Sequence, residues 1–346
     1  MICLIVLKPL REAPNDPEIQ TAAAILLAGG VVAFPTETVY GLGACFDQPE
    51  AVRKIYLAKG RPSDNPLIAL IAGLNQLELL VREWPPLAAK IAAAFWPGPL
   101  TMVLPKVSTV PDEVTAGLDT VAVRMPAHPL ALALITATGT PLVAPSANRS
   151  GRPSPTSAEH VAGDLGDNID AVLDGGISDV GLESTVIGIG EDHIVIFRPG
   201  AVTREMIQSV SGSRFAIEYA EQSVAPPSPG MKYAHYSPEA KVYLVMSAGS
   251  AGAKLAELAD ELALKGEKVG VLAHDDTLAG ISLGLTRLSL GSREDLRFAA
   301  HMLYAQLRLA DHAGLTVLLV EAVDDSGVGM ALMNRLRKAA CKIIEE

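Results

Sequence analysis

Apolar and polar residues alternate along this chain in short blocks that predict buried strands, each followed by a polar loop. The β-branched run at 31–34 predicts a strand that Pro35 ends. Residues 35–43, Pro-Thr-Glu-Thr-Val-Tyr-Gly-Leu-Gly, then place three hydroxyl side chains at the carboxyl end of that strand. Open α/β sheets hold small ligands at such ends. The alternative is a turn whose hydroxyls only satisfy nearby backbone groups.

The same pattern predicts alternating helices and strands over the first 215 residues. Asp16 followed by Pro17 is a helix start, and two glycines at 29–30 end that helix. Ser/Thr at 156–157 with Glu159 predicts another helix start of the capping-box type. Further helices are predicted at 49–58, up to Phe95 and at 128–138, and strands at 1–7, 68–71, 100–104, 119–123 and 141–143.

The pattern changes after residue 215. Residues 216–240 lose periodicity and are rich in Pro and Gly, which predicts a linker. Regular strand–helix alternation follows, which indicates a parallel, Rossmann-like sheet. The predicted α/β chain therefore has a domain at 1–215, a linker or lid at 216–240, and a smaller domain at 241–346. Its elements are strands at 242–246, 269–273 and 315–320 and helices at 251–264, 292–310 and 330–340.

Composition narrows the classes of function. The chain has 346 residues, of which 49% are hydrophobic, and a net charge of −11. That charge argues against bulk electrostatic capture of nucleic acid. No apolar run approaches the roughly 18 residues of a membrane span, and the first residues lack a signal-peptide pattern. Three well-separated cysteines predict a reduced, cytoplasmic protein without a zinc ribbon.

Any phosphate site must therefore be local. Six cations lie in motif-like loops before residue 201, and the loop at 144–156 combines small hydroxyls, an amide and guanidinium groups beside a predicted helix start, which is a natural anion cradle. No P-loop sequence is present, and no paired carboxylates or Ser/His/Asp set predicts a side-chain nucleophile. The cations are Lys59, Arg61, Arg124, Arg149, Arg152 and Arg198.

Eight ordered motifs closely resemble the YrdC-like family of L-threonylcarbamoyladenylate synthases. They lie at 35–43, 59–67, 96–101, 119–126, 144–156, 174–176, 183–187 and 198–200. Residues 229–238 and the α/β tail resemble the longer two-domain branch. The resemblance implies a twisted open sheet with helices, followed by the Rossmann-like domain. It also implies the joining of L-threonine, bicarbonate and ATP into threonylcarbamoyl-AMP and pyrophosphate, for the threonylcarbamoyl modification of adenosine in tRNA.

The resemblance also implies the site residues. Lys59 and Arg61 would be catalytic clamps on the transferring phosphoryl group, since such transfers depend on positioning and electrostatic stabilisation. ATP chemistry implies Mg²⁺, for which the sequence names no ligand, and the product implies a downstream tRNA-modifying transferase. The implied ATP contacts are Lys59, Arg61, Asn65, Thr120, Ser146, Asn148, Ser154, Arg198 and Tyr236. The implied threonine contacts are Thr36, Thr38, Tyr40, Arg124, Ala144 and Ser184.

Two positions depart from the family pattern. Leu70 stands where many relatives carry a histidine near the threonine site, and Ala234 stands at a linker position that is often basic. The aromatic cluster Lys232-Tyr233-x-His235-Tyr236 is unusual for a tether, so we expect the linker to fold over the site, with Tyr236 touching the nucleotide.

Two other classes remain open at this stage. A non-enzymatic RNA-binding module would need an extended basic face, which the net charge does not favour. A carbamoyltransferase of the hydrogenase-maturation type shares a YrdC-like domain but carries zinc-finger cysteine pairs, and this chain has none.

Overall fold

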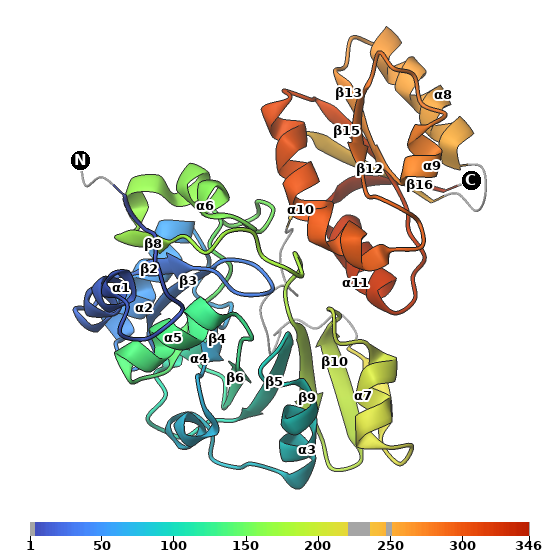
Figure 1. Cartoon of the computed structure of the whole chain (residues 1–346). Helices are drawn as coiled ribbons and strands as arrows, with labels where there is room; N and C mark the ends of the chain where they lie inside the picture. Colours follow the sequence, from blue (N-terminus) through green and yellow to red (C-terminus); the bar gives the residue numbers. More distant parts are fainter. Residues whose placement is uncertain (1–3, 221–235, 247–250, 346) are drawn as a thin grey trace. The chain divides into compact units, whose positions relative to one another are not determined.

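The computed structural model describes residues 4–220, 236–246 and 251–345. The chain divides into two compact α/β units, which confirms the predicted fold class (Figure 1). The first comprises residues 1–150, 154–179 and 183–233, and the second comprises 151–153, 180–182 and 234–346. None of the helices in the described part combines the length and the apolar character that a bilayer crossing requires.

The first unit is built on one mixed sheet of eleven strands, in the order β1-β8-β2-β3-β7-β4-β6-β5-β9-β10-β11. Parallel and antiparallel pairs both occur, as in β4 with β6 and β5 with β6. The strands are β1 (Ile5–Leu7), β2 (Val32–Phe34), β3 (Gly41–Cys45), β4 (Ile68–Leu70), β5 (Leu100–Pro105), β6 (Thr120–Arg124), β7 (Leu142–Val143), β8 (Ala171–Leu173), β9 (Thr185–Ile189), β10 (His193–Arg198) and β11 (Ala216–Tyr219).

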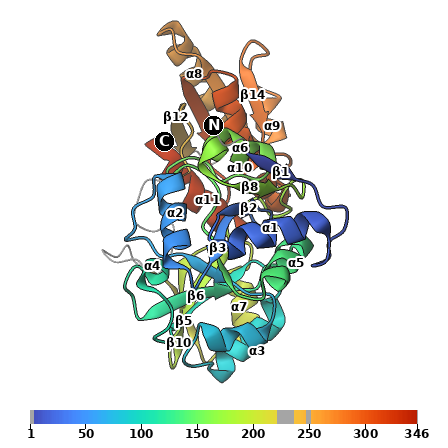
Figure 2. The same cartoon turned by 90° about the vertical axis from the view of Figure 1, so that its left-hand side faces the viewer.

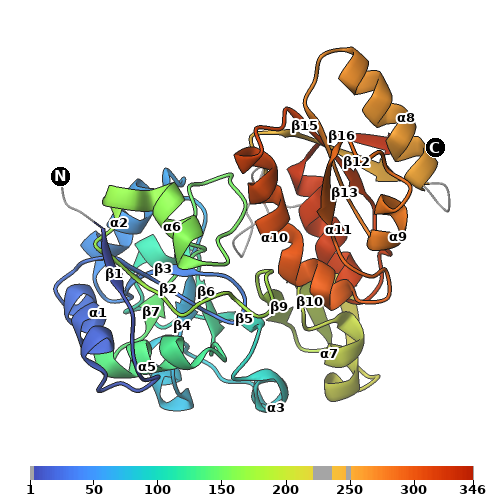
Figure 3. The same cartoon turned by 45° about the horizontal axis from the view of Figure 1, so that its top comes forward.

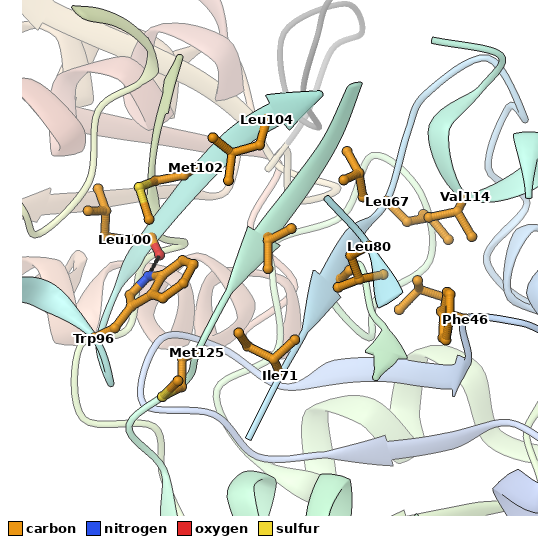
Figure 4. Packing of buried hydrophobic residues seen from close by; sticks show 14 of the residues in the cluster. Phe46, Leu67, Ile71, Leu80, Trp96, Leu100, Met102, Leu104, Val114 and Met125 are labelled. Carbon is orange, nitrogen blue, oxygen red and sulfur yellow. Dashed lines mark hydrogen bonds between the residues drawn. The ribbon is translucent and has the colours of Figure 1, made fainter. Parts of the chain in front are cut away.

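Alternate residues of each strand enter two separate hydrophobic clusters, one on each face of this sheet. In β2, Val32 and Phe34 pack with α1 (Pro17–Leu27) and α5 (Pro129–Thr138), which lie side by side in Figure 2. Ala33 faces the other cluster, part of which Figure 4 shows around Trp96 and Met102. This second face is covered by α2 (Pro49–Lys59), α3 (Pro86–Phe95), α4 (Asp112–Thr115), α6 (Ala158–Leu165) and α7 (Arg204–Ser211).

Most predicted helix ends lie within two residues of the observed ones, but two predicted starts, at residues 156 and 292, lie too early. The helix predicted from residue 292 begins at Leu296, after its cap Asp295. Asp16 caps α1 by accepting a hydrogen bond from the backbone N–H of Glu18. The cap of α6 is Ser157, which accepts from the N–H of His160, and so the capping pair lies one residue later than the predicted start at Thr156. Gly60 ends α2 at a φ of +59°, the left-handed conformation that glycine adopts without strain.

The second unit holds a five-stranded, all-parallel sheet in the order β14-β13-β15-β12-β16 (Figure 3). Parallel strands need crossover helices, which explains the strand–helix alternation of the sequence. The elements are β12 (Lys241–Met246), α8 (Ala251–Leu264), β13 (Val269–Ala273), α9 (Asp275–Leu278), β14 (Thr286–Ser289), α10 (Leu296–His312), β15 (Val317–Glu321), α11 (Val328–Ala339) and β16 (Ala340–Glu345).

The predicted linker at 216–240 begins with a strand of the first sheet. Residues 216–219 form β11, which pairs with β10 in parallel. Ile217 is buried in the second cluster, and the other residues of β11 are exposed. Residues 221–235 lie outside the described residues, and with them the predictions for Lys232, Tyr233, Ala234 and His235.

Candidate functional site

The two threonines of the loop at 35–40 differ in their partners: Thr36 bonds backbone groups of the loop, and Thr38 bonds other side chains. Thr36 Oγ1 accepts from the N–H groups of Thr38 and Val39 and donates to the Val39 carbonyl. This is the local turn that the sequence left open as the alternative. Thr38 Oγ1 lies 2.7 Å from Thr36 Oγ1 and also accepts from Nη1 of Arg124 at 2.8 Å. The loop therefore presents Thr38 to the end of β6.

A buried ion pair lies at that point. Nη2 of Arg124 is 2.7 Å from Oε2 of Glu37, and the two side chains are only 6% and 7% exposed. The two groups are close but not aligned for a hydrogen bond, and neither Glu37 oxygen nor this Nη2 has a hydrogen-bond partner among the described residues. Buried charges of this kind are costly unless hydrogen bonds satisfy them. The pair therefore offers unused donors and acceptors to a small ligand.

Apolar and small residues border the pair. Leu70 is buried and stands beside Arg124 in the register of β4 and β6. Because Leu70 stands where many relatives carry a histidine, this side of the site is apolar. Ala144 is buried as well, and a Cβ at Gly41 would lie 3.1 Å from that of Ala144. The close approach therefore favours glycine at position 41, and a threonine contact at Ala144 stays a prediction.

Ser184 is held by hydroxyl and guanidinium groups from two other strands. Its Oγ lies 2.7 Å from Oγ1 of Thr101 and accepts from Nη2 of Arg198 at 3.1 Å. The turn at 96–99 places it near Arg124, because Gly98 accepts from Arg124 and Pro99 accepts from the residue after Ser184. The expected threonine contacts Thr38, Arg124 and Ser184 thus share one part of the site.

Lys59, which was predicted to be a clamp on the phosphoryl group, is buried. It is 2% exposed, and its ammonium group donates to the main-chain carbonyls of Ser146 and Asn148. The position at the end of α2 aims the side chain inward, under the loop at 144–156. Burial lowers the pKa of Lys59 well below its usual value, and the neighbouring charge of Arg61 lowers it further. Lys59 therefore holds the loop from beneath.

Arg61 lies instead in an open pocket of about 590 Å³. Its guanidinium donates to the Asn65 and Pro66 carbonyls through long bonds of 3.3–3.4 Å. The side-chain amide of Asn65 is buried, and neither its oxygen nor its nitrogen has a partner among the described residues. Arg61 and Asn65 thus provide polar groups for a ligand. The pocket lining is Arg53, Tyr56, Leu57, Gly60, Arg61, Ser63 and Glu113.

The loop at 144–156 has strong internal hydrogen bonds. Ser146 Oγ donates to Oδ1 of Asn148, and the Asn148 amide donates to the Arg149 carbonyl. Ser154 is 1% exposed and donates to the carboxylate of Glu183, which is also buried. Arg152 forms ion pairs with Glu239 and Asp311 at 2.8 and 3.0 Å. These hydrogen bonds and ion pairs hold the loop in place.

The hydroxyl of Tyr40 connects two motifs. It donates to the Gly176 carbonyl at 2.7 Å and accepts from the N–H of Gly175 at 3.1 Å. These bonds tie the loop at 35–43 to the Asp-Gly-Gly loop at 174–176. Burial raises the pKa of Tyr40 to about 12.

This pKa predicts an alkaline loss of stability. Between pH 10 and 12 the unfolded chain releases the phenol proton while the folded chain retains it, so the free energy of unfolding must fall as pH rises. We expect Tyr40→Phe to reduce that fall by on the order of 2 kcal/mol. Urea unfolding of both proteins at pH 9 to 12 measures the difference. Parallel curves would contradict this role of Tyr40.

Two further expected nucleotide contacts are Thr120, at the opposite end of β6 from Arg124, and Tyr236, in the second unit. Thr120 begins β6 and Arg124 ends it, a separation of roughly 13 Å along the strand. The ring of Tyr236 is buried in the second unit, 5.5 Å from the Tyr304 ring, with Arg335 above it at 5.6 Å. Contact of Tyr236 with a nucleotide stays a prediction.

Three buried residues of the site were not among the predicted contacts: Glu37, Thr101 and Glu183. Each stands inside one of the eight motifs, and Glu37 and Glu183 stand directly beside a predicted contact. A carboxylate next to two hydroxyls was a usable signal for Glu37, since an acid between buried strands needs a cation. Nothing in the sequence indicated which cation it would meet.

No three His, Cys, Asp or Glu side chains come together as metal ligands in the part of the chain that the structure describes. The described residues therefore supply no ready set of ligands for Mg²⁺.

Comparison with known proteins covers nearly the whole chain. The family described as "Telomere recombination" matches residues 24–200, and the family "Threonylcarbamoyl-AMP synthase, C-terminal domain" matches residues 202–341. A threonylcarbamoyl-AMP synthase of Bacillus subtilis is 48% identical over 328 residues, which are 94% of each chain. One from Pyrococcus abyssi is 46% identical over 336 residues, which are 96% of each chain.

A solved structure of a relative is similar to this chain over the same length. The crystal structure of P. abyssi Sua5 complexed with L-threonine superposes with a TM-score of 0.91 at 44% identity, over 99% of both chains. The likeness therefore extends through both units of the chain.

Proposed function

This chain belongs to the family of two-domain threonylcarbamoyl-AMP synthases, ATP-using enzymes of the nucleotidyltransferase type. From this premise we propose that it joins L-threonine, bicarbonate and ATP into threonylcarbamoyl-AMP and pyrophosphate. The product would pass in the cytoplasm to a transferase that modifies adenosine in tRNA.

The buried pair of Arg124 and Glu37 is the observation that carries this proposal. An amino acid presents a carboxylate and an ammonium group together, and the pair offers an unused guanidinium N–H and unused carboxylate oxygens side by side. Arg124 suits a carboxylate, because guanidinium and carboxylate geometries match. The P. abyssi relative was solved with L-threonine bound, which supports the same substrate here.

The nucleotide would occupy the pocket of Arg61 and the adjoining loop at 144–156. The threonine amine would first add to bicarbonate with loss of water, which gives a carbamate. A carbamate oxygen would then attack the α-phosphorus of ATP, and the bond from that phosphorus to the pyrophosphate oxygen would break. Negative charge grows on the phosphoryl oxygens during this step, and Arg61, which lines the pocket, would stabilise it. Any Mg²⁺ would be held mainly by ATP phosphates, as is usual for this ion.

Incubation with L-threonine, bicarbonate and ATP tests the proposal. We expect pyrophosphate release that requires all three substrates and a product with the mass of threonylcarbamoyl-AMP. Pyrophosphate that forms equally well without threonine, or none from a folded protein, would contradict it.

Selectivity for the threonine hydroxyl is a further expected result. Thr38 and Ser184 are buried hydroxyls beside Arg124, and Thr36 supports that loop. Sites that bond a substrate hydroxyl reject analogues without it, because buried polar groups are then left unpaired. Valine should therefore be used at least a hundredfold less efficiently than threonine, as kcat/KM for pyrophosphate release. Equal efficiencies would show that these residues do not form the amino-acid site.

A further inference from the structure

Strand β5 is buried and apolar except for one hydroxyl side chain, that of Thr101, the last residue of the motif at 96–101. Leu100, Met102 and Leu104 pack in the hydrophobic cluster on one face of the sheet (Figure 4). Thr101 points to the other face, as Val103 does, because side chains alternate along a strand. It is completely buried, and a valine would fill such a position without burying a polar group. The packing of β5 therefore does not explain this hydroxyl.

Among the described residues, the hydroxyl of Thr101 is hydrogen-bonded to that of Ser184. The two oxygens are 2.7 Å apart, and either of them could donate. The parallel pairing of β5 with β9 causes this approach, since it sets Thr101 opposite Val186, two residues after Ser184. Only one of the two hydroxyl protons can lie between the two oxygens. The pair therefore keeps one O–H for which the described residues supply no acceptor.

The remaining O–H is best assigned to Ser184. Thr101 is enclosed in β5, so its proton has Ser184 as its acceptor, and buried donors are seldom left unpaired. Ser184 Oγ also accepts from Nη2 of Arg198 at 3.1 Å. Its two lone pairs are then both filled, by Thr101 and by Arg198. Ser184 thus has a proton to donate and no further lone pair to offer.

Thr38 has the opposite hydrogen-bonding character. Thr36 donates its one hydroxyl proton to the Val39 carbonyl at 2.6 Å, so the proton between Thr36 and Thr38 comes from Thr38. Thr38 Oγ1 accepts from Nη1 of Arg124, which leaves it one lone pair and no proton. The expected threonine contacts thus include one acceptor, Thr38, and one donor, Ser184. A single substrate hydroxyl complements both.

We propose that Thr101 is a positioning residue of the amino-acid site, an inference that rests on the proposed function. Its hydrogen bond holds the hydroxyl of Ser184 as a donor, so that the substrate hydroxyl accepts from Ser184 and donates to Thr38. Thr101 acts through Ser184 and does not itself contact the substrate. Without this bond, a lone pair of Ser184 is unfilled and its hydroxyl is no longer held in one orientation.

Threonine and valine test this role, because valine carries a methyl group in place of the hydroxyl. With the full chain, pyrophosphate release at saturating ATP and bicarbonate gives KM for threonine, and competition gives the inhibition constant of valine. Thr101→Val should raise KM for threonine about tenfold, as expected for one weakened hydrogen bond. The kcat should change little, because the bond is made before the reaction as well as during it. The inhibition constant of valine should stay the same, since valine has no hydroxyl to lose.

Two further variants separate positioning from packing. Thr101→Ser keeps the hydroxyl and should restore KM for threonine. Thr138→Val is the matched control, because Thr138 is also buried and its hydroxyl donates to the Ile135 carbonyl within α5. It should leave both constants unchanged.

Three results would overturn the proposal: an unchanged KM for threonine in Thr101→Val, an equal rise of both constants, or a Thr101→Ser protein that behaves like Thr101→Val. The proposed function would survive each of them, as long as the parent protein releases pyrophosphate only when threonine is present. A parent protein without that release would contradict the proposed function, and this inference with it.

Discussion

Replacing Arg61 by alanine is expected to slow pyrophosphate release about a hundredfold or more, which is typical for one lost electrostatic donor. The guanidinium lines the open pocket, and its hydrogen bonds to the Asn65 and Pro66 carbonyls are long, at 3.3–3.4 Å, so we expect them to add little to the stability of the fold. The melting temperature should therefore change little. Initial rates of pyrophosphate release at saturating substrates, with the thermal unfolding curve of the same preparation, measure both expectations.

Two other variants serve as comparisons for Arg61→Ala. Arg82→Ala removes an exposed guanidinium whose ion pair among the described residues is with Glu83 at the surface, and it should keep full activity. Lys59→Met removes a buried ammonium from two carbonyls, so it should destabilise the protein by about 2–4 kcal/mol as well as lower activity. Near-normal pyrophosphate release by a folded Arg61→Ala protein would show that Arg61 takes no part in the reaction.

Replacing Arg124 by methionine should have the largest effect on both stability and activity. The change leaves the Glu37 carboxylate buried without its cation, and breaking such a pair costs about 3–5 kcal/mol. It also removes the group proposed to bind the substrate carboxylate. We therefore expect a lowered urea midpoint together with a loss of threonine-dependent pyrophosphate release.

The double variant Arg124→Met with Glu37→Gln separates the two effects. A neutral glutamine no longer needs the cation, so most of the lost stability should return. Activity should not return, because neither charge is left to bind the amino acid. A double variant that regains threonine-dependent release would show that the pair is structural and does not bind substrate. A single variant as stable as the parent protein would show that Glu37 takes up a proton instead.

Local patterns predicted most of the elements of this fold. The caps at Asp16 and Gly60 act over a few neighbouring residues, so they could be predicted without any tertiary information. The edge strand β11 was missed, because Ile217 is its only buried residue and the pairing with β10 supplies the rest. Strand β16 follows α11 without an intervening loop, which no turn signal marks.

The sequence by itself determined the class of the site: which loops hold it, which cations and hydroxyls it can use, and, through the ordered motifs, the family of reaction. Only the tertiary structure decided which charges meet. Glu37 and Arg124 are 87 residues apart, counted from their sequence numbers, and nothing local could pair them. The tertiary structure also decided that Lys59 is buried, because a lysine at the end of a helix is normally exposed. The loop at 144–156 covers Lys59 and accepts its hydrogen bonds. Burial depends on what packs above a residue, and its neighbours in sequence do not reveal that.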